Sequence, residues 1–451
     1  MVPGGPSGPL ARSSRRALTC RARFLPSSAH NHYEIGQVNP KGVTARLRRR
    51  TNALLIAAGA SIGLTALTNS GLAWAAAGQR PASAVGSHLA ELAGSGSKAL
   101  DWFGAAVAVS GNTIVVGAPA EPSQSEGIGQ VYVFTKTPTG WHQSARLRGT
   151  GADGPDWFGD SVAVWGHTIV VGAPAISVLS SGVGHVYVFT ETATGWHQSA
   201  ELHSPGAVVA DWFGDSVAVS GRTIVVGAPN RASKAGEAYV FTKSGHGWQT
   251  TNLRGSDTVA KDDFGDSVAA SGHTVVVGAF GHASEAGRAY VFTKTNNKWH
   301  QTAELSGIGT IPGDGFGVSV AVADKTIAVG AGLAASDAGR VYVFARTATG
   351  WRQRAELAGA NRADEDDFGD SVAVSGRNVV VGTFAQAPRP GQAYLFSGTA
   401  TGWRQTAQLT SDSSPAGGNE FGYSVAISGS TIVVGAKDDK SGAGRAYLFK
   451  A

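Results

Sequence analysis

Cysteine is almost missing from this chain of 451 residues, since Cys20 is its single copy. The residues after it therefore offer no thiol for a disulfide, a thiolate metal site or a cysteine nucleophile. Charge is also scarce, at 15% Asp, Glu, Lys and Arg, whereas 42% of the residues are hydrophobic. This balance excludes bulk disorder and allows a large core.

Most of the chain also lacks an excess of basic residues, although the formal net charge is +5. Ten of the 37 Lys and Arg residues lie in residues 1–78, together with a single acid, Glu34. Residues 79–451 hold the other 27 basic residues against 31 acids, a net charge of about −4. A nucleic-acid partner is therefore not expected.

No apolar run is long enough for a stable membrane span, which needs about twenty residues. The longest candidate, from Ala53 to Leu67, contains Gly and Thr and follows a basic stretch at Arg46–Arg50. Small residues at Ala73–Ala77 then resemble a cleavage site. Residues 46–78 thus have the layout of a secretory signal peptide, and a retained single anchor is the alternative. Arg49-Arg50 also raises a twin-arginine export route.

The leader predicts a protein that is secreted or held at the cell surface, with no membrane span in the mature chain. Residues 1–45 precede this signal and are rich in Pro, Ser and Arg without periodicity. They are interpreted as a disordered extension or as an over-long start assignment, with Val43 as an alternative start.

Glycine is abundant instead, with 63 copies, and it recurs in a repeat. A Phe-Gly pair returns at intervals of 51 to 55 residues, at Phe103, Phe158, Phe213, Phe264, Phe316, Phe368 and Phe421. The second copy predicts four short strands, at 158–164, 168–173, 185–189 and 196–202, joined by turns that contain Gly. No segment has a helical period long enough to identify a helix.

Seven repeats of four strands predict an all-β fold: a seven-bladed β-propeller of four-stranded antiparallel blades over residues 87–451. The last copy stops after its third strand, at Tyr447–Ala451, and lacks a fourth. A matching orphan segment, His88–Leu92, lies ahead of the first copy. The N-terminal strand is therefore expected to complete the last blade and close the ring, which removes exposed sheet edges. A monomer is expected.

At these positions the chain resembles the bacterial type of the FG-GAP repeat family. One copy carries the three motifs Phe213–Ala218, Val225–Pro229 and Ala238–Phe241. The resemblance implies a propeller like that of integrin α subunits, and by analogy extracellular ligand binding and adhesion. Integrin-type copies often carry an Asp-rich calcium loop between their first two strands, but here that connection is as short as Ser110–Asn112. Calcium sites are therefore not expected, because calcium needs six to eight oxygen ligands.

Two sets of repeated acids are candidate ligand-binding residues. Asp stands two residues before the Phe in six copies, including Asp101, Asp156 and Asp211, and a second Asp follows the Gly in four, including Asp160 and Asp215. The segment should approach the central channel, where a ring of carboxylates would attract a cation or a basic group. The alternative is that each Asp caps a turn.

The position just before the Phe differs among the copies. The first three have Trp102, Trp157 and Trp212, which could stack a sugar or a peptide, while packing between blades is the alternative. Later copies have acids or Gly there.

A search for catalytic residues is negative. Three histidines, His142, His197 and His300, are expected on outer strands, and two more, His167 and His273, in tight turns. There is no Gly-x-Ser-x-Gly elbow, His-Glu-x-x-His motif or phosphate loop. No catalytic residue, metal ligand or cofactor is predicted. The expected function is an exported, non-enzymatic binding or adhesion module that recognises a surface protein, peptide or polysaccharide through one propeller face. A glycan- or ester-acting enzyme and a structural scaffold are the alternatives.

Overall fold

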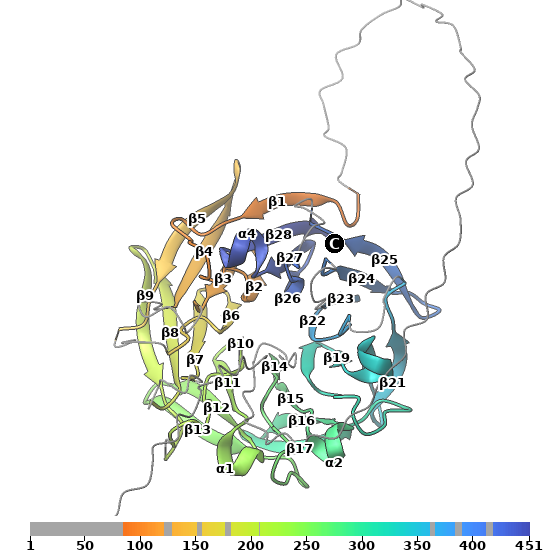
Figure 1. The fold of residues 1–451 in the computed structure, drawn as a ribbon. Coiled ribbons are helices and arrows are strands. Elements are labelled where there is room, and N and C mark those ends of the chain that lie inside the picture. Colours follow the sequence, from red (N-terminus) through yellow and green to blue (C-terminus); the bar gives the residue numbers. More distant parts are fainter. Residues whose placement is uncertain are drawn as a thin grey trace, which may run out of the picture. The chain divides into compact units, whose positions relative to one another are not determined.

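The computed structural model describes residues 84–120, 129–150, 156–175, 182–206, 208–360, 366–383, 390–411 and 418–451. The predicted N-terminal extension and signal peptide, residues 1–45 and 46–78, lie outside them. Among the described residues, no helix is long and apolar enough to span a membrane. These residues form seven four-stranded antiparallel sheets arranged around a ring (Figure 1). The prediction of a seven-bladed β-propeller is confirmed.

In the first six blades the four strands follow chain order from the channel outwards, and each pairs antiparallel with the next. Blades 1 to 3 are β2 (Ala106–Ser110), β3 (Thr113–Ala118), β4 (Gln130–Thr137) and β5 (Gly140–Leu147); β6 (Ser161–Trp165), β7 (Thr168–Ala173), β8 (His185–Thr192) and β9 (Gly195–Leu202); and β10 (Val217–Ser220), β11 (Thr223–Ala228), β12 (Glu237–Ser244) and β13 (Gly247–Leu253). Blades 4 to 6 are β14 (Val268–Ser271), β15 (Thr274–Ala279), β16 (Arg288–Thr295) and β17 (Lys298–Leu305); β18 (Ser319–Ala323), β19 (Thr326–Ala331), β20 (Arg340–Thr347) and β21 (Gly350–Leu357); and β22 (Ser371–Ser375), β23 (Asn378–Gly382), β24 (Ala393–Gly398) and β25 (Trp403–Leu409).

The seventh blade is built from both ends of the ring. It comprises β26 (Phe421–Ser428), β27 (Thr431–Ala436), β28 (Arg445–Lys450) and, as its outer strand, β1 (His88–Leu92). In the register of this pair, Glu91 lies opposite Tyr447 and Leu92 opposite Ala446. Figure 1 shows β1, at the orange end of the colour scale, beside the blue β28. The predicted closure of the ring by the N-terminal strand is confirmed.

Among the described residues, four single helical turns interrupt the β structure, each between the second and third strands of a blade. They are α1 (Arg231–Lys234), α2 (His282–Glu285), α3 (Ala334–Asp337) and α4 (Asp439–Gly442). Each contains two residues with left-handed backbone angles, such as Ala232 (φ 53°) and Ser233 (φ 59°) in α1. Turns of four residues are too short to leave a helical period in the sequence.

The burial of each strand follows its composition. The second strands carry β-branched residues on both faces, and the Thr-Ile-Val-Val-Gly-Ala sequence of β11 is buried throughout. The fourth strands alternate between half-buried and exposed residues and end in a buried Leu, as β21 does at Leu357. The channel and the core therefore lie on the inner side, and the fourth strands form the rim.

The hydrophobic core is divided into seven clusters, each of which is shared by two neighbouring blades. One joins Leu92 and Leu448 of the last blade to Phe103 and Tyr132 of the first. Every Phe of a Phe-Gly pair is fully buried and meets the Tyr of its own third strand with ring centroids 5.3 to 5.6 Å apart. Offset or edge contacts of this kind are favourable for aromatic pairs.

The repeated glycines allow the blades to approach each other closely. A Cβ atom on Gly172, in β7, would lie 1.9 Å from the carbonyl oxygen of Gly214 in the next blade. Gly214 itself, in a Phe-Gly pair, has φ +99°, a conformation that side chains other than Gly rarely adopt. The motif residues of the repeat are therefore required at the junctions between blades.

A belt of serine hydroxyl groups adds hydrogen bonds across these junctions. Ser161 Oγ donates to the carbonyl oxygen of Gly214 in the next blade at 2.7 Å. Equivalent bonds, 2.5 to 2.8 Å long, are donated by Ser216, Ser267, Ser319, Ser371 and Ser424. The last of these crosses from blade 7 to Gly104 of blade 1. Blade 1 has Ala106 at this position and cannot donate the seventh bond.

Candidate functional site

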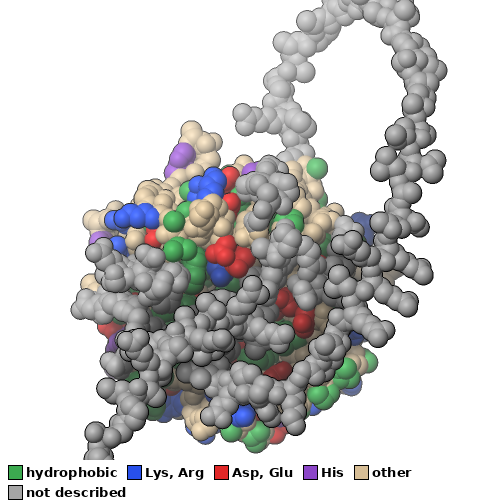
Figure 2. Space-filling model, in the orientation of Figure 1, with side chains coloured by type: hydrophobic (Ala, Val, Ile, Leu, Met, Phe, Trp, Pro, Cys, Tyr) green, Lys and Arg blue, Asp and Glu red, His purple; other side chains and the backbone are tan. Residues whose placement is uncertain are grey.

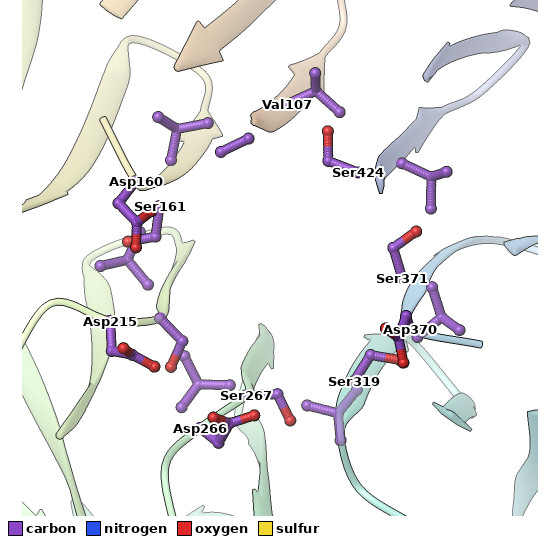
Figure 3. A pocket seen from close by; sticks show the side chains of 18 of the residues that line it. Val107, Asp160, Ser161, Asp215, Asp266, Ser267, Ser319, Asp370, Ser371 and Ser424 are labelled. Atoms are coloured by element: carbon purple, nitrogen blue, oxygen red, sulfur yellow. The ribbon is translucent and has the colours of Figure 1, made fainter. Parts of the chain in front are cut away.

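A central cavity of about 200 Å³, open to solvent, is lined by residues at the start of the innermost strands. Each blade contributes three consecutive residues to its wall, namely a variable residue, the belt Ser or Ala106, and a Val. The variable residue is Asp in four blades, and Figure 3 shows Asp160, Asp215, Asp266 and Asp370 around the cavity. Ala105, Val318 and Tyr423 take the position in the other three. The predicted location of Asp160 and Asp215 at the channel is confirmed.

Asp370 is the most strongly perturbed acid of this ring. It is only 9% exposed, and its Oδ1 receives no hydrogen bond from the described residues. Burial raises the pKa of Asp370 well above its usual range, and the nearby acids Asp367, Asp266 and Asp337 add to this rise. A positively charged group entering the cavity would relieve that repulsion.

The Asp two residues before each Phe has a different environment. Asp101 Oδ2 accepts the backbone N–H of Lys98 at 2.7 Å. Asp156 and Asp211 accept the N–H of the following Phe, at 3.3 and 3.1 Å. Asp211 is also held by Ser204 and Arg231. The geometry is therefore that of turn caps, the structural alternative for this set, and its ligand-binding role stays a prediction.

The residue just before each Phe shares one backbone conformation in all seven blades, with φ between +48° and +65°. Three of these residues are the predicted Trp102 (φ 57°), Trp157 (φ 63°) and Trp212 (φ 58°). The others are Asp263, Gly315, Asp367 and Glu420. Gly and Asp adopt this region readily, but a bulky Trp is strained there. Such strain persists only where the surroundings hold the residue in place.

Two of the three tryptophans are in contact. The rings of Trp102 and Trp157 lie edge to face, with centroids 6.0 Å apart and planes at 61°. Trp157 is 7% exposed, and its indole Nε1 finds no hydrogen-bond acceptor among the described residues. Trp212 is half-buried in the next blade. In the predicted arc, Trp102 and Trp157 therefore pack against each other, and the indole N–H of Trp157 is a hydrogen-bond donor without an acceptor among the described residues.

A buried cation that the sequence reasoning missed lies at the junction of blades 7 and 1. Lys437 Nζ lies 3.0 Å from Glu420 Oε2, 4.8 Å from the ring centre of Trp102 and 4.3 Å from that of Tyr423. Its signal is a break in the repeat, because blades 1 to 3 have Pro at this position. Lys437 covers one face of Trp102 and so limits stacking of a ligand on that ring.

Acids also replace Trp beside the channel in the later blades. Burial raises the pKa of Asp263 to about 7, opposed by Lys234 and reinforced by Asp215, Asp262 and Glu285. Burial likewise raises the pKa of Glu420 to about 7 against the attraction of Lys437. Figure 2 shows acidic side chains (red) near the middle of the face that it presents. The charge of Asp263 and that of Glu420 therefore depend on their surroundings.

Three histidines lie where they were predicted, since His142, His197 and His300 are on the outer strands β5, β9 and β17. In blade 2, His185 and His203 both lie near Glu201. The sequence reasoning did not connect these three residues, because they become neighbours only through the pairing of β8 with β9.

The fold and the repeated site place the chain in a class, the closed β-propellers with a polar channel. A family model described as the FG-GAP repeat matches residues 87–134, 141–189, 196–241, 248–292, 299–344, 351–396 and 403–449. The chain therefore belongs to the FG-GAP repeat family.

Searches for individual relatives add little to this assignment. No curated protein matches the chain. Among solved structures, the chain is similar to Sqt1 of Chaetomium thermophilum, with 14% identity and a TM-score of 0.46 over 76% of this chain and 82% of the other. A second structure of Sqt1 has 16% identity and a TM-score of 0.45 over 76% and 81%.

Proposed function

We propose that the protein is an exported, non-enzymatic binding module that recognises a surface protein, peptide or polysaccharide through one face of the propeller. The observation that carries the proposal is the ring of Asp160, Asp215, Asp266 and Asp370 around a central cavity. Asp266 contributes to the raised pKa of Asp370, so acids of this ring lie close enough to interact, and a cationic group of a ligand would be attracted there.

The tryptophan arc supports binding at the rim of the same site. Trp157 and Trp212 keep left-handed backbone angles that a bulky residue adopts only at a cost. The buried Nε1 of Trp157 offers a hydrogen-bond donor without a partner among the described residues. An aromatic surface with one polar atom suits a peptide or a sugar. Trp102 contributes less, because Lys437 already occupies one of its faces.

Exposed apolar side chains on the same set of loops suit a protein partner. The loops that lead from the fourth strand of one blade to the first strand of the next carry five residues that are 51% to 75% exposed: Val208, Val209, Val259, Ile308 and Ile311. Apolar exposure of this degree is common at sites of protein association. Export is proposed from the leader alone, since residues 46–78 have the layout of a signal peptide.

The test is a pull-down with the full-length secreted protein against arrays of glycans, cell-wall material and surface proteins. The double variant Trp157→Ala, Trp212→Ala should lose binding and keep its β-sheet circular dichroism. Asp215→Asn should weaken binding and reduce its dependence on salt, because charge attraction is screened by ions.

A matched control is Trp165→Ala. Trp165 is 52% exposed and lies at the other end of β6 from Asp160. This variant should bind as the parent protein does. Equal loss of binding in the control and the double variant, or unchanged binding in the double variant, would remove the assignment of the site. Intact protein that begins at Met1 in the cytoplasm would overturn export.

An enzyme that acts on glycans or esters is the second candidate, because Asp263 has a pKa of about 7 and could exchange a proton near neutral pH. Turnover in a broad substrate panel that disappears in Asp263→Asn would favour this candidate over a binding module.

A further inference from the structure

Two histidines and a glutamate form a compact group at the outer edge of blade 2. His185 opens β8, Glu201 lies near the end of β9, and His203 follows that strand. Their potential ligand atoms all lie within 4.8 Å of one another. His185 Nδ1 is 2.7 Å from Glu201 Oε1, and His203 Nε2 is 3.8 Å from the same oxygen. The two imidazole rings lie 5.2 Å apart, nearly perpendicular.

The other blades show what usually stands at these positions. In blades 4, 5 and 7 an Arg takes the place of His185 and pairs with the Glu equivalent to Glu201. These pairs are Arg288–Glu304 at 2.8 Å, Arg340–Glu356 at 3.3 Å and Arg445–Glu91 at 2.7 Å. The position of His203 is held there by Ser306, Ala358 and Ala93. Blade 2 therefore keeps the Glu, replaces the Arg with His and adds a second His.

The two histidines give the outer edge of blade 2 groups that can ligate a metal ion. A guanidinium group stays protonated and cannot ligate a metal ion, whereas a neutral imidazole can. Two imidazoles and a carboxylate are the three protein ligands found in many zinc sites, where water or another ligand completes a tetrahedral arrangement. Nitrogen donors favour a transition ion over calcium or magnesium, which prefer oxygen.

The backbone already holds the three residues in place. In the β8–β9 pairing, Tyr187 lies opposite Glu201 and Val186 lies opposite Leu202, so the three residues lie at the end of this strand pair. The ring of His185 stacks on that of Tyr187, with planes at 19° and centroids 6.2 Å apart. His185 and Glu201 keep 29% and 31% of their side chains exposed, so an ion can enter from solvent. Rotation of side chains, without movement of the backbone, would turn the ring nitrogens towards an ion.

We infer that His185, Glu201 and His203 form a binding site for one divalent transition-metal ion of the zinc type. The site lies on the third and fourth strands of blade 2, away from the central cavity, and does not depend on the proposed function. Among the described residues, other His–acid pairs lack the second imidazole: His167 pairs with Glu191, and His282 with Asp257 and Asp262.

The test is a titration of the metal-free, full-length protein with Zn²⁺ alone, followed by calorimetry and equilibrium dialysis. The parent protein should bind one more equivalent of Zn²⁺ than the variant His185→Arg. That variant rebuilds the Arg–Glu pair of blades 4, 5 and 7, so its thermal unfolding midpoint without metal should match that of the parent. Loss of one ligand in His203→Ala should weaken the affinity at least tenfold, and His203 is exposed enough for the fold to tolerate the change.

His167→Ala is the matched control, because it removes the histidine of a His–Glu pair that has no third ligand. It should leave the high-affinity equivalent unchanged. Absorption spectra with Co²⁺ in place of Zn²⁺ should show tetrahedral coordination that is lost in both His185→Arg and His203→Ala. Equal stoichiometry and affinity in the parent and these two variants, or no binding of Zn²⁺ to the parent at micromolar concentration, would overturn the inference.

Discussion

The residue before each Phe-Gly pair shows how a repeat can fix a backbone and leave a side chain free. All seven copies adopt a left-handed conformation there, with Trp in three blades, acids in three and Gly315 in one. The backbone N–H groups of Trp102, Asp263 and Asp367 each donate to a carbonyl group in the loop between the second and third strands of the preceding blade. The conformation is therefore set by the junction between blades, and the side chain is available for other roles.

Asp263 provides a test at this scale. Burial raises its pKa to about 7, so its stabilising contribution is complete well below pH 4 and is lost as the pH rises through 7. We expect Asp263→Asn to stabilise the fold at pH 8 by roughly 1–3 kcal/mol, the usual cost of an unsatisfied buried polar group. At pH 5 the difference should be much smaller. Thermal unfolding at both pH values measures the effect.

Asp324→Asn is the control for that experiment. Asp324 has a similar backbone angle, φ 50°, but is exposed in the turn between β18 and β19. Its replacement should change the unfolding midpoint little at either pH. An equal gain for Asp263→Asn at pH 5 and pH 8 would contradict the assigned pKa.

At the residue scale, the sequence predicted where functional candidates lie more successfully than it predicted which side chains they contact. It singled out the seven residues before Phe as the place where the copies differ, and it placed Asp160 and Asp215 at the channel. It could not show that Lys437 covers Trp102, because that contact joins residues more than three hundred positions apart across the closing junction. Nor could it decide between capping and ligand binding for Asp211, since that choice depends on distances to the N–H of Phe213 and to Arg231.

The elements are joined mainly through their inner strands. Six serines donate hydrogen bonds to the next blade, and Ala106 interrupts this belt between blades 1 and 2. The carbonyl oxygen of Gly159 is the acceptor left without a serine there. The belt therefore lacks one hydrogen bond, between blades 1 and 2, and a serine hydroxyl group at position 106 could supply it.

We expect Ser267→Ala to destabilise the protein and Ala106→Ser to stabilise it, each by about 0.5–1.5 kcal/mol, the net value of one intramolecular hydrogen bond. The double variant should return close to the parent, because the two sites share no partner. Urea unfolding of the four proteins measures these differences. A loss of stability in Ala106→Ser would show that the serine belt is not what stabilises the junctions.

At the element scale the sequence predicted the strands well, because their signals are local. The strand Thr168–Ala173 was predicted with the bounds that β7 has, since it is a run of β-branched residues between turns. The third strand was predicted to end at Phe189 but continues to Thr192, because its last residues pair with the polar start of β9. The His–Glu–His group was missed since it depends on that pairing.

The whole ring is held closed by one short strand. β1 supplies Leu92 to the hydrophobic cluster shared by blades 7 and 1, and Glu91 to an ion pair with Arg445 at 2.7 Å. Without β1, the backbone of β28 would present an unpaired edge, and such edges recruit other strands. The stability of the ring and its resistance to edge-to-edge association should therefore depend on these five residues.

We expect a variant that lacks residues 84–92 to unfold at a lower temperature than the parent and to self-associate. Leu92→Ala is the comparison, because it leaves the β1–β28 backbone pairing intact but opens a cavity that should cost about 2–5 kcal/mol. It should lose stability and keep the same oligomeric state as the parent. Light scattering coupled to gel filtration, together with thermal unfolding, measures both. A truncated protein with the parent's mass and midpoint would show that β1 is dispensable.

Closure through β1 also means that the ring could begin in another blade, with the order of the blades around it unchanged. The N–H of Gly86 donates to the carbonyl of Lys450, and the N–H of Lys450 to the carbonyl of Ser87, so the two ends of the ring already lie side by side. A short linker could join them, and new ends could be opened in a surface turn such as the one at Gly245, where an added side chain meets nothing within 4 Å. The ring therefore admits circular permutation. Any blade could become the one that is assembled from strands at both ends of the chain.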